Sequence, residues 1–73
     1  MPVTPLLNAR EVVKAFGAFG WQVSRQSGSH IVLVKDDHSA TLSVPNHKPV
    51  ARGTLRSLIR DAGLTVSEFV SAV

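Results

Sequence analysis

The chain has 73 residues, no cysteine and a net charge of +3, with eight Lys and Arg against five Asp and Glu. This length allows one small core, and the lack of cysteine excludes a disulfide framework and a thiolate metal site. No apolar run approaches the ~20 residues that span a bilayer, and residues 1–7 lack the features of a signal peptide. We expect residues 1–73 to form one cytoplasmic domain with no membrane partner. The modest basic excess suits a polyanionic partner and an ordinary soluble protein equally well.

Residues 8–19 carry the signals of an amphipathic helix. Asn8 is a suitable N-cap, Glu11 stands three residues later as in a capping box, and Gly20 is a natural stop. The apolar residues recur at helical spacing, at Ala9, Val12, Val13, Phe16 and Phe19. This helix is expected to cover one face of a sheet.

Three short strands should follow the helix. Residues 21–25 alternate between apolar and polar, which predicts a half-buried strand, and residues 26–28 form a turn. Residues 31–34 are all aliphatic, which predicts a central strand covered on both faces. Residues 40–44 alternate again, before Pro45 ends the strand. In this last strand the side chains expected to face the core are Ala40, Leu42 and Val44. Tight turns between the strands predict an antiparallel meander.

Two further helices complete the chain. Thr54 is the expected N-cap of an amphipathic helix over residues 54–62, which Gly63 closes. Its apolar positions are Leu55, Leu58, Ile59 and Ala62. Thr65 and Glu68 form a capping box for a short last helix. The order predicts an α+β fold with a three-stranded antiparallel sheet and helices 8–19 and 54–62 on the same face.

His30 is the ionisable side chain at the entrance of the central strand, directly after Gly28 and Ser29. Without other information, a lone histidine at a strand end is more often structural than catalytic. His47, in a polar loop, could supply a general acid or could be solvated, and His38, in an acidic turn, should face solvent without a role. The spacing of the three histidines matches no zinc site.

A basic line continues from the loop into the second helix. Arg56 and Arg60 lie four residues apart on its polar face, and Lys48 and Arg52 precede them. The default interpretation is a solvated surface, and the alternative is a track for backbone phosphates. Trp21 is expected to be a packing residue.

Four motifs together resemble the HicA toxins of bacterial and archaeal toxin–antitoxin pairs. They are Gly28-Ser29-His30, Val44-Pro45-Asn46-His47, Gly53-Thr54-Leu55-Arg56-Ser57-Leu58 and Ala62-Gly63-Leu64. The resemblance implies a double-stranded-RNA-binding-domain-like α-β-β-β-α fold. It also implies a metal-independent endoribonuclease that cleaves mRNA, needs no cofactor and is held inactive by a HicB antitoxin.

These implications give a specific site hypothesis. RNA carries its own nucleophile, the 2′-hydroxyl, and a histidine with a reference pKa of ~6.5 suits removal of its proton near neutral pH. We expect His30 to be the catalytic proton-transfer residue and His47 to be a possible general acid. The residues expected to contact RNA are Ser29, Lys35, Lys48, Arg52, Arg56 and Arg60.

Two alternatives remain open from the sequence. The first is a non-catalytic RNA-binding module, because the same fold binds duplex RNA by shape alone. The second is a protein-interaction subunit, whose apolar and basic surface serves an antitoxin. A nuclease assay of the isolated chain distinguishes both from an enzyme.

Overall fold

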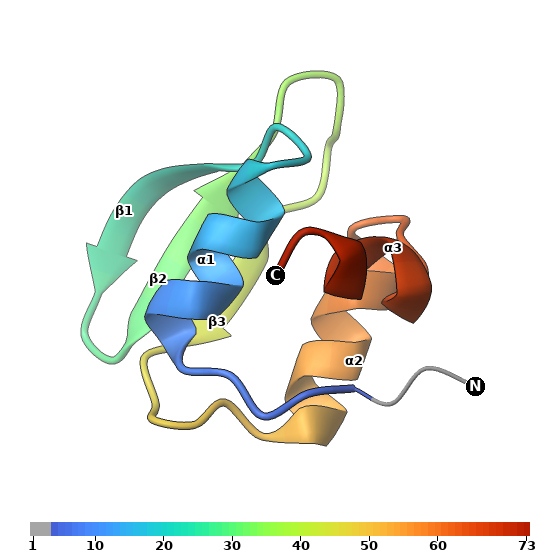
Figure 1. The fold of residues 1–73 in the computed structure, drawn as a ribbon. Helices are drawn as coiled ribbons and strands as arrows, with labels where there is room; N and C mark the ends of the chain where they lie inside the picture. The colour runs from blue at the N-terminus through green and yellow to red at the C-terminus, as the bar shows by residue number, and fades with distance from the viewer. Residues whose placement is uncertain (1–3) are drawn as a thin grey trace.

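The computed structural model describes residues 4–73, which form three helices and one three-stranded sheet. In chain order the elements are α1 (Ala9–Gly17), β1 (Gln22–Ser27), β2 (His30–Val34), β3 (Leu42–Pro45), α2 (Arg52–Asp61) and α3 (Val66–Ser71). Both strand pairs are antiparallel and β2 is central, with the helices gathered on one side of the sheet (Figure 1). The predicted α+β fold is confirmed. Residues 1–3, part of the segment expected to lack a signal peptide, lie outside the described residues.

Local capping explains why α1 begins where the sequence predicts, whereas the helix ends at Gly17, two residues before the predicted end at residue 19. The backbone N–H of Asn8 donates to Glu11 Oε1 over 3.0 Å, which is the reciprocal contact of a capping box. At the other end, Gly20 has φ of +95°, and the following Trp21 N–H donates to Phe16 O over 3.3 Å. This is a Schellman turn, in which a glycine adopts the left-handed conformation at low cost.

The predicted N-cap of α2, Thr54, is wrong, because the helix begins two residues earlier, at Arg52. Val50 is buried and forms a β-bridge with Leu7, whose carbonyl accepts its N–H over 2.7 Å. This tertiary contact fixes the chain just before the helix, so that Ala51 takes the N-cap position without a side-chain cap. The apolar face of α2 is buried as predicted, at Leu55, Leu58, Ile59 and Ala62.

The short helix α3 begins at the predicted capping box. Thr65 N–H donates to Glu68 Oε1 over 2.9 Å, and Glu68 N–H donates to Thr65 Oγ1 over 3.1 Å. Phe69 of this helix is fully buried. Its ring centroid lies 4.8 Å from that of Phe16, whose ring lies 6.5 Å from Trp21, so three aromatic side chains join α1 and α3 to the start of β1. The packing role predicted for Trp21 is confirmed.

The prediction that β2 is covered on both faces is wrong. Leu33 is fully buried and Ile31 packs against the same core, whereas the alternate residues His30 and Val34 are exposed. The helices cover one face of the sheet, and the described residues provide no second layer for the other (Figure 1). Successive side chains of a strand point to opposite faces, so only every second residue of this apolar run faces the core.

Both edge strands are less buried than predicted. All residues of β1 are exposed, so the half-buried assignment is wrong, and Val23 keeps 53% of its surface accessible. Figure 1 shows β1 at the edge of the sheet, curving away from the helices. In β3, Leu42 and Val44 are buried as predicted, but Ala40 lies before the strand and is exposed.

Candidate active site

His30 lies at the first position of the central strand, beside a two-residue hairpin loop. Strand β1 extends through Ser27, so the turn is formed by Gly28 and Ser29, with φ of +57° at Gly28. His30 pairs with Ser27 on one side and with Pro45 on the other. The backbone of His30 is therefore held between two neighbouring strands, which gives its side chain a fixed point of attachment.

The side chain of His30 belongs to the open face of the sheet. Ile31 and Leu33 face the helices, so His30 and Val32 point the other way. His30 is exposed, and no side-chain hydrogen bond to its ring is found within residues 4–73. The imidazole is thus accessible to a ligand that approaches from the uncovered side.

The loop after β3 brings His47 to the same end of the sheet. Asn46 N–H donates to Ser29 O over 2.6 Å, and His47 N–H donates to Pro45 O over 2.8 Å. The first N–H of α1, that of Ala9, donates to His47 O over 3.1 Å. The backbone around His47 is therefore fixed beside the hairpin that carries Ser29 and His30, while the His47 side chain remains exposed.

The four basic residues of the predicted track begin at this end of the sheet and lead away from it. Lys48 is exposed in the loop, and Arg52 Nε donates to the carbonyl of Thr4 over 3.0 Å. Arg56 and Arg60 are exposed along α2. At 1.5 Å per helical residue, Arg60 lies roughly 12 Å beyond Arg52 along the helix axis. Arg60 is thus at the end of α2 remote from His30, as Figure 1 shows for the two ends of this helix.

Lys35 is not brought next to His30. It follows the last residue of β2, so five strand steps place it about 16 Å from His30. Its half-buried side chain passes Gly20, where an added Cβ would lie 3.4 Å from Lys35 Cε. The Lys35 position belongs to the opposite end of the sheet.

Arg25 is the cationic residue near His30 that the sequence analysis does not select. It pairs with Val32, which puts it on the open face, one diagonal step from His30. The pairing register shifts between Val23 and Arg25. The available signal was the hairpin itself, since counting back from His30 across a two-residue loop places Ser27 and Arg25 on the same face as His30.

His38 does not face solvent as predicted. It is half-buried, its ring centroid lies 4.9 Å from that of Trp21, and its Nδ1 accepts the N–H of Ala40 over 3.3 Å. These contacts close the loop between β2 and β3, far from His30.

Within residues 4–73, no group of three or more His, Cys, Asp or Glu side chains is placed to hold a metal ion.

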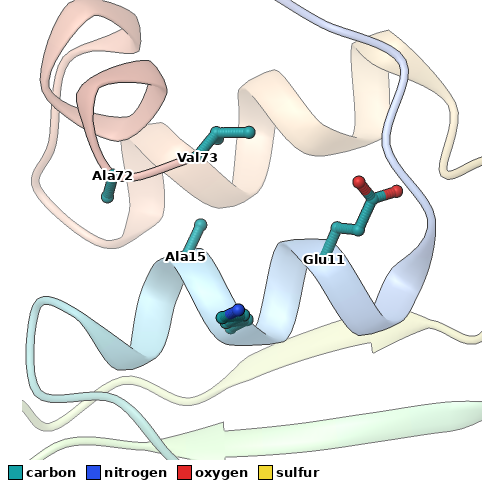
Figure 2. Close-up of a pocket in the computed structure, with 5 residues that line it drawn as sticks. Glu11, Ala15, Ala72 and Val73 are labelled. Carbon is teal, nitrogen blue, oxygen red and sulfur yellow. The ribbon is translucent and has the colours of Figure 1, made fainter.

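A hollow of about 260 Å³ lies between α1 and the C-terminal residues. Its lining residues are Glu11, Lys14, Ala15, Ala72 and Val73. Figure 2 shows Glu11, Ala15, Ala72 and Val73 on the side of α1 that faces away from the strands. The hollow is thus separated from His30 by both the helix layer and the sheet.

A family model described as the HicA toxin of bacterial toxin–antitoxin systems matches residues 9–64. This chain belongs to the HicA toxin family. The matched segment runs from the first residue of α1 to just beyond α2, so it includes His30 and the loop of His47. HicA membership gives the chain a toxin role within a toxin–antitoxin system. A comparison with curated proteins gives no significant match. In the described part of this HicA protein, no helix has the length and apolarity needed to cross a membrane.

Proposed function

We propose that this chain is a cytoplasmic endoribonuclease that cleaves mRNA without a metal ion or cofactor, with His30 as the proton-transfer residue. The supporting observation is the exposed imidazole on the open face of the central strand, in a chain of the HicA family. An exposed imidazole on a fixed backbone can contact a large polymer such as RNA. A side chain buried in the helix-covered core could not.

The proposed reaction uses the nucleophile that RNA carries. The neutral imidazole of His30 accepts the proton of a 2′-hydroxyl, and the 2′-oxygen forms a bond to the adjacent phosphorus. The bond from phosphorus to the 5′-oxygen of the next nucleotide breaks, and that oxygen takes up a proton. The products are a 2′,3′-cyclic phosphate and a free 5′-hydroxyl. A positioned acid or base of this kind contributes roughly 10²–10⁴-fold in rate.

His47 is the proposed donor of the proton to the leaving oxygen. It is an exposed histidine in the loop that is hydrogen-bonded to the carbonyl of Ser29 through Asn46. Ser29 lies in the turn directly before His30 and is the proposed hydroxyl contact to RNA.

The basic residues are proposed to hold the RNA backbone on either side of the cleavage point. Lys48 and Arg52 are the ones nearest in the chain to the His47 loop, and Arg56 and Arg60 extend the contact along α2. Lys35 would meet the same RNA only at the far end of the sheet. Such backbone contacts set affinity and register and carry no sequence information.

A HicB-like antitoxin is the proposed protein partner, and it would block RNA by covering the face that carries His30. The open face of the sheet supports this proposal, because it leaves Val34 with 37% of its surface accessible beside polar side chains. A partner bound to this face would bury Val34 and exclude RNA at the same time.

The test compares the isolated wild-type chain with His30→Ala on a mixed-sequence RNA in EDTA. We expect cleavage by the wild type and at least about a 100-fold loss in the variant. The fold should persist, because His30 is exposed. The matched control is His38→Gln, which removes a histidine at the other end of the sheet. Thermal melting of each variant separates loss of activity from loss of structure.

Three outcomes would contradict the proposal. Cleavage by His30→Ala at the wild-type rate would reject the assignment of His30. Loss of wild-type cleavage on chelation would reject the metal-independent reaction. RNA binding by the wild type without any cleavage would identify a non-catalytic RNA-binding module.

A further inference from the structure

The open face of the sheet surrounds His30 with a defined set of neighbours. Ser27 stands directly opposite His30 on β1, and Pro45 directly opposite on β3. Arg25 and Ser43 both pair with Val32, the next residue of β2 on this face, so each is a diagonal neighbour of His30. Diagonal neighbours on a sheet lie roughly 7–8 Å apart, which is within reach of a long side chain.

The pairing of β1 with β2 puts Arg25 on this face, and an irregularity in β1 separates it from Val23. Val23 pairs with Leu33, which faces the core, and regular alternation would give Arg25 the same orientation. The register instead shifts at this point by one extra residue, Ser24, so that Arg25 pairs with Val32. A β-bulge of this kind re-aims the side chains that follow it. From Arg25 to the hairpin the pairing is regular, so Arg25 lies on the same face as Ser27 and His30, opposite to the face of Val23.

The charge on this face is positive only. The residues that register assigns to it are Gln22, Arg25, Ser27, His30, Val32, Val34, Ser43 and Pro45, and none is acidic. Arg25 is exposed, and within residues 4–73 no ion pair or side-chain hydrogen bond occupies its guanidinium. Its donors are therefore available to an anion beside His30.

We propose that Arg25 binds the phosphate group at which His30 acts, and stabilises the charge that builds on it during cleavage. This inference rests on the proposed endoribonuclease function. The guanidinium presents two parallel N–H donors to two phosphate oxygens, a geometry that fits phosphate and that lysine lacks. A phosphate between the two diagonal side chains contacts Arg25 through its non-bridging oxygens, while the neighbouring 2′-hydroxyl meets the imidazole of His30.

This assignment separates Arg25 from the arginines of α2. Arg25 shares the sheet face with His30, whereas Arg56 and Arg60 project from a helix on the other side of the sheet and lead away from the hairpin. Arg25 therefore acts on the reacting phosphate, and the α2 arginines act on phosphates farther along the strand. Removing Arg25 should therefore slow the cleavage step. Removing the α2 arginines should leave the rate of that step unchanged.

The experiment measures single-turnover cleavage of one RNA by the wild type, Arg25→Gln, Arg25→Lys, His30→Ala and Lys14→Gln. Lys14→Gln is the charge-matched control, because it removes one exposed positive charge from α1. Rates are taken at saturating enzyme in about 0.1 M and about 1 M salt, where the Debye length falls from about 10 Å to about 3 Å. Thermal melting confirms that each variant is folded.

We expect Arg25→Gln to slow the cleavage step at least about 10-fold at both salt concentrations, because a direct charged hydrogen bond is little affected by screening. Arg25→Lys should recover part of the rate, since it keeps the charge and loses the paired donors. Lys14→Gln should change the rate less than about threefold. Equal rates for Arg25→Gln and Lys14→Gln would overturn the role of Arg25, and so would a loss in Arg25→Gln that disappears in high salt.

The same data separate this inference from the function on which it rests. If the wild type cleaves and His30→Ala does not, while Arg25→Gln matches the control, only the inference about Arg25 fails. If the wild type leaves the RNA intact in this assay, the proposed nuclease activity fails and the inference fails with it.

Discussion

His30 and His47 differ in how the backbone holds them. His30 is part of the sheet, paired with β1 and β3, while His47 lies in a loop fixed by hydrogen bonds to Pro45 and Ala9. Both side chains are exposed at the same end of the molecule. Two histidines at one site can divide the reaction between them, one removing a proton and the other supplying one.

A variant of His47 tests this division of roles. His47→Ala should slow cleavage of normal RNA by roughly 10²-fold or more, because the leaving 5′-oxygen would depart without a proton. An RNA whose leaving atom is sulfur needs no such proton, so His47→Ala and the wild type should cleave it at similar rates. The measurement is the ratio of the two rates for each protein, with His38→Gln as the control. An equal loss on both substrates would show that His47 has some other role.

The elements around the site divide its positive charge into two groups. The pairing of β1 with β2 places Arg25 on the open face, and α2 carries Arg56 and Arg60 along the helix layer. Residues four apart on a helix lie on one face, about one turn from each other. This spacing suits contacts to successive phosphates of an RNA backbone. The α2 group is therefore expected to contribute affinity.

Replacing Arg56 and Arg60 with Gln measures that contribution. In the His30→Ala background, which is expected to leave RNA intact, binding should weaken for all sequences alike. The slope of log affinity against log salt should flatten by about 1.4 units, since each of the two lost phosphate contacts on single-stranded RNA contributes about 0.7. The control replaces Arg10 and Lys14, also exposed and four residues apart on α1. If the two double variants have the same slope and affinity, the α2 arginines do not contact RNA.

At the scale of the whole molecule, a single layer of helices covers a single sheet. A domain near this length buries only roughly 60% of the surface of its unfolded chain, so its stability is expected to be small. The uncovered sheet face leaves polar and cationic residues accessible beside Val32 and Val34. A protein partner that binds this face would both stabilise the fold and exclude RNA.

Antitoxin binding should therefore appear in two measurements at once. A ligand present at 100 times its Kd stabilises a protein by about 2.7 kcal/mol, which corresponds to a rise in Tm of roughly 10–20 °C for a domain of this size. RNA cleavage should fall in parallel as the HicB-like protein is added. An unrelated protein at the same concentration serves as the control. A cognate antitoxin that raised Tm but left cleavage unchanged would bind elsewhere on the molecule.

Local patterns in the sequence determined most of the elements and their order. The capping residues Asn8 and Thr65 and the glycine Gly20 acted through contacts within a few residues, so the helix ends they define could be predicted. The resemblance to the HicA toxins also depended on short motifs that stay together in the chain. The sequence therefore indicated the fold class, the family and His30 as the candidate catalytic residue.

Only the tertiary structure decided which face each side chain occupies. The alternation of side chains along a strand defines two faces, but it does not show which face the helices cover. The apolar run of β2 therefore appeared to be buried on both faces. The early start of α2 depends on Val50 pairing with Leu7, a contact between distant parts of the chain. One extra residue in β1 puts Val23 and Arg25 on opposite faces, because the side-chain period of a strand is two and a shift of one inverts it. The neighbours of His30 follow from that register.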